Sequence, residues 1–356
     1  MGDEMSLIRR LDAHHLLPQS GRRAAAALAL TLACAALPAT AGVLESVKAR
    51  GTLICGINPN LPGFGAPDAQ GAFQGLNADI CRAIAAAVLG DAGKVKFLPL
   101  TAANRFTALQ TGEVDVLTHN TTWTMSRDTA LGMRLVATAY YDGQGFLVRR
   151  ALGIKSATEL AGASVCAQQG STTELNAADF FRARNLKYEA VTFASNDEAT
   201  AAFGAGRCEV LTGDASALIG ERRKLASPGD FTVLPDIISK EPLGPAVRKG
   251  DDTWFDIVRW TFFALVNAEE AGVTKANADE MSKGKNPEVR RLLGAEGEFG
   301  KGISLEPAWA LNAVKAVGNY GEIFDRNLGE GSAIKLPRGA NALWSKGGLM
   351  YAPPVR

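Results

Sequence analysis

Residues 79–98, DICRAIAAAVLGDAGKVKFL, place a helical pattern directly before a strand pattern. Ile80, Ile84 and Val88 recur on one face of a helix, and Gly90 stands where such a helix would end. We therefore expect a helix over residues 79–89. The β-prone residues 94–98 predict a strand. A helix that alternates with strands is typical of an α/β sheet whose strands run parallel.

The same alternation extends on both sides of this stretch. A strand is expected before it, over residues 52–57, and a helix over residues 104–110 and a strand over residues 114–117 are expected after it. A second, similar set of helices and strands follows along the chain, and two such sets predict two α/β lobes. The second set comprises a short helix at 156–160, a strand at 163–167, a helix at 174–184, a strand at 188–193, a helix at 197–204 and a strand at 209–212.

Two segments connect the sets, one extended and flanked by Gly and the other punctuated by Pro and Gly. Residues 143–150 lead from the first set to the second, and residues 241–249 lead back into a long expected helix over residues 254–270. The chain thus leaves one lobe, builds the other and returns, which predicts two hinge crossings and a cleft where a small ligand binds. The expected division is residues 42–143 plus 248–356 for the first lobe, 150–241 for the second, and 144–149 and 242–247 for the hinges.

The composition is that of an ordinary globular protein. The 356 residues are 47% hydrophobic and 21% charged, and 38 Lys and Arg oppose 37 Asp and Glu. Such a balance excludes a disordered or multi-span membrane chain. A formal net charge of +1 gives no electrostatic reason to expect nucleic acid as a partner.

The N-terminus has the features of a secretory signal. Arg22 and Arg23 precede an apolar run over residues 24–37, and small residues follow Pro38 at positions 39–41. This run is too short to span a bilayer as a helix but suits a signal peptide. We expect residues 1–41 to be an upstream extension plus a cleaved signal. The alternative is a permanent N-terminal anchor.

The histidines and cysteines narrow the chemistry. After residue 41 only His119 remains, which excludes a zinc site built on several histidines and leaves a catalytic triad only one candidate base. No metal and no cofactor is expected. Four of the five cysteines lie after residue 41, and an even number of cysteines in an exported chain favours disulfides. We expect Cys55–Cys81 and Cys166–Cys208, because each pair then lies within one predicted lobe; the alternative is four buried free thiols.

Several motifs together resemble a known family, the periplasmic solute-binding proteins of ABC transporters for polar amino acids, and most of all its general L-amino-acid subgroup. The resemblance covers nearly all of residues 44–356 and implies the type II periplasmic-binding-protein fold. The motifs that carry it are residues 51–53 with Gly56, 75–84, 104–109, 112–116, 121–124 with Arg127, 169–174, 206–210 running to Asp214, 317–324 and 341–344.

The resemblance also implies a ligand site, and its chemistry agrees with the residue types. Arg127 can hold the carboxylate of a free amino acid by two parallel hydrogen bonds. Asp214, at the carboxyl end of an expected strand, can accept from the ammonium. The other expected ligand residues are Thr122 and Thr124, as hydroxyl and backbone donors to the carboxylate, Ser171 and Thr172 at the start of a helix, Trp123, and Phe64.

Each of these residues also has an ordinary structural interpretation. Arg127 can be a surface arginine, and Asp214 can cap a helix that begins at Ala215. Ser171 and Thr172 can be helix caps, and Trp123 can belong to a core. Small residues at 102–103 and at Gly213 leave room in the site, which fits a pocket that reads the backbone shared by all amino acids.

We therefore expect a periplasmic protein that binds L-amino acids with broad specificity. It would act as a monomer and deliver its ligand to an ABC-type inner-membrane permease and its ATPase, without catalysis. The alternatives are an enzyme on the same scaffold, similar to cyclohexadienyl dehydratase, with His119 or Glu174 as general acid, and an amino-acid sensor module.

Overall fold

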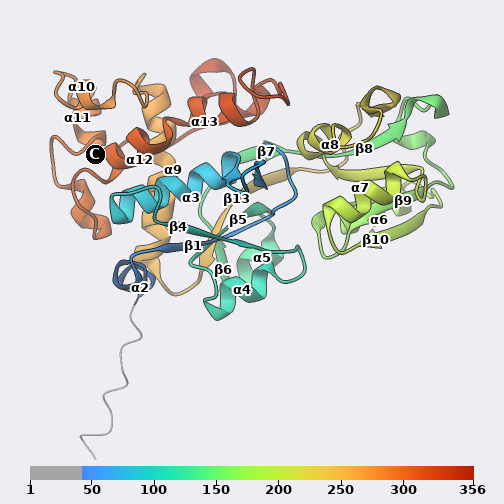
Figure 1. Cartoon of the computed structure of the whole chain (residues 1–356), viewed down its shortest axis with the longest axis horizontal. Helices are drawn as coiled ribbons and strands as arrows, with labels where there is room; N and C mark the ends of the chain where they lie inside the picture. Colours follow the sequence, from blue (N-terminus) through green and yellow to red (C-terminus); the bar gives the residue numbers. More distant parts are fainter. Residues whose placement is uncertain (1–41) are drawn as a thin grey trace, which may run out of the picture. The chain divides into compact units, whose positions relative to one another are not determined.

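The computed structural model describes residues 42–356, so the expected signal peptide lies outside the described residues. Two sheets organise this part of the chain (Figure 1). We call the six-stranded sheet with its helices the first lobe, and the five-stranded sheet with its helices the second lobe. No helix within residues 42–356 has both the length and the apolar character needed to cross a membrane.

The first lobe is built on the order β4-β1-β5-β13-β6, with β7 also paired to β13. β1, β4 and β5 run parallel, and β13 runs antiparallel to β5, β6 and β7. The strands are β1 (Leu53–Ile57), β4 (Val95–Pro99), β5 (Val116–Thr122), β6 (Met133–Leu135), β7 (Tyr140–Asp142) and β13 (Glu241–Arg248), and a small hairpin is formed by β2 (Ala66–Pro67) and β3 (Phe73–Gln74).

The second lobe is built on the order β10-β9-β11-β8-β12, in which β9, β10 and β11 run parallel and β8 and β12 run antiparallel. Its helices α6 and α7 lie beside β9 and β10 in Figure 1. Its elements are β8 (Gln144–Arg149), β9 (Ser164–Gln168), α6 (Thr172–Ala183), β10 (Glu189–Phe193), α7 (Asn196–Gly204), β11 (Val210–Asp214), α8 (Ala215–Arg222) and β12 (Phe231–Val233).

The expectation of parallel strands is confirmed for β1, β4 and β5 and for β9, β10 and β11, whereas β8 and β13 run antiparallel to their neighbours. β8 and β13 are the strands by which the chain enters the second lobe and re-enters the first. Neither follows a strand and crossover helix of its own sheet, and parallel pairing depends on such a crossover. The structure also has strands where linkers were expected: residues 144–149 are β8, and residues 242–247 lie within β13. The chain crosses between the sheets at Gly143 and again between β12 and β13.

The helix expected over residues 79–89 is confirmed as α3 (Leu76–Leu89). Ile80 and Ile84 are buried in the core of the first lobe. Gly75 is the N-cap of this helix, and its φ is 124°. A Cβ at this position would lie 2.2 Å from the backbone carbonyl carbon of Phe64. Only glycine accommodates both this conformation and this approach. Gly75 therefore fixes the loop of residues 58–65 against the start of α3.

The C-terminal region adds helices that the sequence patterns did not predict, apart from the long α9 (Asp252–Glu270). α12 packs on α3 and α9, as Figure 1 shows. The remaining helices of the first lobe are α2 (Val43–Arg50), α4 (Arg105–Thr111), α5 (Met125–Ala130), α10 (Ala278–Ser282), α11 (Pro287–Leu292), α12 (Trp309–Val317) and α13 (Tyr320–Asn327).

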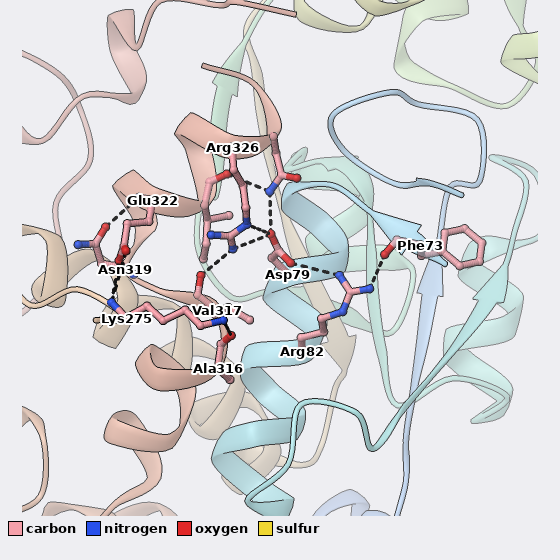
Figure 2. A network of polar contacts seen from close by, with 11 residues as sticks. Phe73, Asp79, Arg82, Lys275, Ala316, Val317, Asn319, Glu322 and Arg326 are labelled. Carbon is pink, nitrogen blue, oxygen red and sulfur yellow. Dashed lines mark hydrogen bonds and ion pairs between the residues drawn. The ribbon is translucent and has the colours of Figure 1, made fainter. Parts of the chain in front are cut away.

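A polar network anchors this region to α3 (Figure 2). The carboxylate of Asp79 accepts from Arg326 Nη2 at 2.8 Å, from Asn327 Nδ2 at 2.7 Å and from Arg82 Nη1 at 3.2 Å. Arg326 also donates to the carbonyl of Val317 at 2.6 Å. Asp79 is buried, so its charge is matched by several donors at once. α13 is thereby held on the first lobe.

Both expected cysteine pairs lie at disulfide distance. The Cα atoms are 6.3 Å apart for Cys55 and Cys81, and 5.7 Å apart for Cys166 and Cys208. Cys55 lies in β1 and Cys81 in α3, so this pair links a strand to a helix within the first lobe. The other pair links β9 to the segment before β11 within the second lobe. Each lobe is therefore cross-linked internally.

Candidate functional site

One pocket is lined by residues of both lobes. Six come from the first lobe, from β5, the loop after β1 and the start of α4, among them Arg105 and Thr122, and the others come from the helices and strand ends of the second lobe. The lining comprises Asn58, Leu61, Arg105, His119, Asn120, Thr122, Gln168, Ser171, Thr172, Thr173, Asn196, Ala199, Thr200, Leu211, Thr212, Gly213, Asp214, Ala217, Leu218 and Glu221.

Polar contacts join the lobes beside this pocket. Thr122 Oγ1 in β5 lies 3.1 Å from Thr172 Oγ1 in α6. Lys224, just after α8, donates to the carbonyl of Asn60 in the first lobe at 2.7 Å and to the carboxylate of Asp197 at 2.6 Å. The Asn60 amide also donates to Asp197. The pocket is thus enclosed between two sets of contacts.

Asp214 lines the pocket at the junction of β11 and α8. It occupies the N-cap position of α8, yet its side chain accepts no capping hydrogen bond. The capping interpretation of this residue therefore does not describe its side chain. Gly213 beside it also lines the pocket and adds no side chain. The carboxylate remains available to a cationic group.

The start of α6 forms another wall. Ser171 is the N-cap: its hydroxyl accepts from Glu174 N and donates to the carbonyl of Gln168 at 2.6 Å. The backbone N–H groups of Thr172 and Thr173 lie in the first turn, where a helix has no internal acceptor for them. Such groups and the helix dipole favour an anion. Ser171 is therefore a cap, and the first turn of α6 offers donors to the pocket.

Thr122 and Thr172 share one acceptor that the sequence analysis missed. Both hydroxyls donate to Glu241 Oε2, at 2.6 Å from Thr122 and 3.2 Å from Thr172. Glu241 is the first residue of β13 and is buried. Both threonines line the pocket, and Glu241 lies behind them.

Arg127 is buried next to the pocket rather than in its lining. Its Nη1 donates to the carbonyl of Thr122 at 3.0 Å, and its guanidinium lies 5.2 Å from the ring centre of Phe106. Burial lowers the pKa of Arg127, and the charges of Glu241 and Asp214 oppose this shift. The surface interpretation of Arg127 does not describe this position. Thr124 caps α5 by accepting from the backbone N–H of Arg127.

Arg105 is a basic residue of the lining that the sequence analysis did not select. It is 4% exposed, and its Nη1 lies 3.1 Å from His119 Nδ1 and donates to the carbonyl of His119 at 3.2 Å. Its Nε has no hydrogen-bond partner within residues 42–356. Burial lowers the pKa of Arg105, as does the charge of Arg127, whereas Asp214 raises it. Arg105 thus presents a positive charge at the pocket.

His119 supports Arg105. Burial, followed by the charge of Arg105, lowers the pKa of His119 to about 3, so the ring is neutral at physiological pH. Its Nε2 lies 2.7 Å from the carbonyl of Leu100. A neutral ring that donates from Nε2 to this carbonyl accepts at Nδ1, which is the atom that faces Arg105.

Acidic side chains cluster where the lobes meet. Asp142 ends β7 and pairs in register with Glu241. Burial raises the pKa of Asp142 to about 6. Burial also raises the pKa of Asp214 well above its ordinary value; Asp142 and Glu241 add to this shift, and the two arginines oppose it. Burial and the acidic neighbours therefore outweigh the two arginines at Asp214, and a ligand ammonium would add positive charge there.

Two expected ligand residues lie elsewhere. Trp123 lines a different pocket, together with Tyr141, Phe262 and Tyr351. Adjacent residues of an extended chain point to opposite sides, so Thr122 at the binding pocket directs Trp123 away from it. Phe64 is 1% exposed and packs edge-on against Tyr140, with ring centres 5.1 Å apart. From the same loop, Asn58 and Leu61 line the pocket instead.

The described residues contain no arrangement suited to a metal ion. Among residues 42–356, no group of three or more His, Cys, Asp or Glu side chains is placed to hold one. The polar groups of the pocket are instead the guanidinium of Arg105, the carboxylates of Asp214 and Glu221, of which Glu221 is paired with Lys224, several hydroxyls and amides, and the backbone donors of the first turn of α6. Such a set can bind a zwitterion by charge-assisted hydrogen bonds.

Known proteins are similar to this chain in sequence and fold. The chain is 56% identical over 330 residues to the general L-amino acid-binding periplasmic protein AapJ of Rhizobium johnstonii, covering 92% of this chain and 97% of that protein. It is 57% identical over 319 residues to the glutamate/glutamine/aspartate/asparagine-binding protein BztA of Rhodobacter capsulatus, covering 89% and 94% of the two chains.

A solved structure agrees with these relatives. An ABC transporter periplasmic binding protein from Brucella ovis, with glutathione bound, superposes with a TM-score of 0.87 at 54% identity and covers 89% of this chain and 100% of its own. The sequence model of the bacterial extracellular solute-binding proteins, family 3, matches residues 53–275. The chain belongs to the bacterial extracellular solute-binding proteins of family 3.

Proposed function

We propose that this protein binds L-amino acids with broad specificity in the periplasm and delivers them to an ABC-type inner-membrane permease and its ATPase. The observation that carries the proposal is a pocket with Arg105 from one lobe and the uncapped carboxylate of Asp214 from the other. Opposite charges on facing walls suit a ligand that is itself a zwitterion. The names of AapJ and BztA support the same ligand class.

We assign the two poles of the ligand to different walls. Asp214 accepts from the ammonium, because burial and its acidic neighbours outweigh the two arginines there. The α-carboxylate lies at the first turn of α6, where Thr172 and Thr173 line the pocket and their backbone N–H groups have no acceptor within the helix, with Arg127 supplying positive charge from behind Thr122. Arg127 makes no ion pair within 4.0 Å in the described part of the chain, so its charge is open to an incoming carboxylate.

Arg105 and its neighbours give the pocket its selectivity. The unpaired Nε of Arg105 suits a side-chain carboxylate or amide oxygen. Asn58, Asn120 and Thr200 add neutral polar groups that serve charged and uncharged side chains alike. Small residues such as Gly213 and Ala217 leave space in the same lining. We infer broad specificity with acidic and amide amino acids preferred.

We propose that the protein is not an enzyme. Catalysis on this scaffold would need a general acid, and the two candidates are poorly suited to that role. His119 is neutral and has both ring nitrogens engaged. Glu174 lies in the first turn of α6, where its carboxylate accepts from Gly170 N at 3.0 Å. Incubation with prephenate or arogenate tests this statement: formation of a decarboxylated product would contradict it.

The remaining parts of the proposal concern export and assembly. We propose that the signal peptide ends at Ala41, that the mature protein is a monomer and that its lobes divide near the boundaries given above. The disulfides within each lobe fit an oxidising compartment. N-terminal sequencing of exported protein should begin at Gly42, and sedimentation should give a single monomeric species.

Identification of the ligand tests the central proposal. Protein purified in its native state is denatured, and the released small molecules are identified by mass spectrometry. Isothermal titration calorimetry then measures binding of the twenty L-amino acids to refolded, ligand-free protein. We expect micromolar dissociation constants for several of them, about −8 kcal/mol each. Absence of heat with every amino acid would reject the ligand class.

A further inference from the structure

Glu241 is a buried carboxylate that the proposed ligand contacts do not use. Its side chain is 1% exposed. It begins β13, the strand by which the chain returns to the first lobe, and it pairs in register with Asp142, the last residue of β7 before the chain leaves. The segment by which the chain leaves the first lobe and the segment by which it returns are therefore neighbours at Glu241 and Asp142.

The carboxylate accepts four hydrogen bonds, two on each oxygen. Oε2 accepts from the hydroxyls of Thr122 at 2.6 Å and Thr172 at 3.2 Å. Oε1 accepts from Asn176 Nδ2 at 2.7 Å and from Ser239 Oγ at 2.7 Å. Thr122 belongs to β5 of the first lobe, whereas Thr172 and Asn176 belong to α6 of the second. A single side chain is thus bonded to both lobes.

These bonds fix how the threonines face the ligand. A hydroxyl has one proton to donate. Thr122 and Thr172 give theirs to Glu241, so both present oxygen lone pairs to the pocket. The Thr122 hydroxyl is therefore not free to donate to a ligand carboxylate while this bond is made. The backbone N–H groups of α6 are left as the donors from that wall.

We propose that Glu241 is a positioning residue for lobe closure, a brace whose carboxylate holds Thr122 of one lobe and Thr172 and Asn176 of the other in the ligand-bound arrangement. When the lobes open, the donors of one lobe move away from those of the other, and they can no longer all bond to the same carboxylate. Glutamine cannot replace this group, because its amide nitrogen would face a donor. The inference rests on the proposed function only in taking an amino acid as the ligand.

A plainer role would give a different pattern of mutant effects. If the donors only satisfy a buried charge, each of them should matter equally wherever it comes from. Asn176 and Ser239 separate the two roles. Both donate to Oε1 at 2.7 Å, but Asn176 lies across the lobe boundary, whereas Ser239 lies two residues before Glu241 on the same segment.

The experiment compares Asn176→Ala with its matched control, Ser239→Ala. Stopped-flow fluorescence measures dissociation of L-glutamate, and small-angle scattering of ligand-free and saturated protein measures lobe opening. We expect Asn176→Ala to dissociate about tenfold faster and to scatter as a more open particle, and Ser239→Ala to stay within about twofold of wild type in rate. Glu241→Gln should dissociate about a hundredfold faster. Glu269→Gln, which alters a carboxylate paired with Arg338 far from the pocket, should behave as wild type.

Equal effects of Asn176→Ala and Ser239→Ala on dissociation and on scattering would overturn the brace. So would wild-type dissociation in a folded Glu241→Gln. If Glu241→Gln does not fold, the Asn176 and Ser239 pair decides the question alone. If wild type binds no amino acid, the proposed function fails, and scattering of the two ligand-free variants still tests the brace: a more open Asn176→Ala supports it, and identical profiles contradict it.

Discussion

Arg105, the first residue of α4 in the first lobe, and Asp214, the last residue of β11 in the second, line the same pocket. Each acts on the other as opposite charges do: Asp214 raises the pKa of Arg105, and Arg105 lowers that of Asp214. Burial opposes both effects, so each charge in the closed pocket is short of a full partner. A zwitterionic ligand supplies one charge to each, and the predictions below follow from this relationship.

Removal of Arg127 should weaken binding of every amino acid. Arg127→Ala removes the positive charge behind Thr122 that we assign to the α-carboxylate, a group common to all of them. Loss of one partner of a buried, hydrogen-bonded charge pair costs about 3 kcal/mol, or ~100-fold in affinity. Calorimetry with L-glutamate and L-alanine measures it, with Arg134→Ala, a surface ion-pair variant, as the control. Unchanged affinity for both ligands would remove Arg127 from the account.

Removal of Arg105 should change selectivity instead. Arg105→Leu removes a guanidinium of the pocket lining whose Nε has no hydrogen-bond partner in the described part of the chain. We expect L-glutamate to lose about tenfold or more in affinity relative to L-alanine, because only the former has an anionic side chain to pair with it. Competition titrations of the two ligands against one variant give this ratio directly. An equal loss for both ligands would mean that Arg105 serves the shared backbone or the fold.

Asp214→Asn should impair ammonium binding and proton release. A neutral amide loses the charge that the ligand ammonium requires, so affinity should fall by about 100-fold. Binding of the ammonium favours the charged carboxylate and lowers the raised pKa of Asp214 in wild type, so protons should be released on binding. Calorimetry in buffers of different ionisation enthalpy measures that release. Equal proton release by wild type and variant would contradict the assignment.

Asp142 should make ligand-free stability depend on pH. Its pKa is raised from 3.8 to about 6 in the folded protein, so the fold binds this proton more tightly than the unfolded chain does. The resulting stability is fully present below pH 4 and is lost as the pH rises through 6. Asp142→Asn should therefore gain on the order of 1–2 kcal/mol at pH 7.5 relative to wild type, with little gain at pH 4. Urea unfolding at the two pH values tests this; an equal difference at both would contradict it.

Local sequence patterns were sufficient for the elements with a clear period. The spacing of Ile80 and Ile84, followed by Gly90, predicted α3, and the β-prone run after it predicted β4. Strand direction was not predictable in the same way. It depends on where the chain comes from, and β8 and β13 each enter their sheet from the other lobe. The division into two sets of strands could be predicted from the sequence, because each set is one continuous stretch of alternating helices and strands along the chain.

The site was predictable only in part, for a similar reason. The family resemblance implied Thr122, Thr172 and Asp214, and all three line the pocket. Arg105 lies within one of the motifs of the resemblance, residues 104–109. Its burial depends on hydrogen bonds to Nδ1 and to the carbonyl of His119, and the spacing of residues along the chain does not reveal these bonds. Glu241 takes its donors from distant elements as well. Its position at the start of a predicted crossing was the only signal that marked it.

The most direct test of the account compares one amino acid with two analogues that each lack a pole. L-glutamate has both, glutarate lacks the ammonium, and 4-aminobutyrate lacks the α-carboxylate. Calorimetry on the wild-type protein should give a micromolar dissociation constant for L-glutamate and values at least about 100-fold weaker for both analogues, because each leaves one buried charge unpaired. If either analogue bound as tightly as L-glutamate, recognition of both poles would be contradicted.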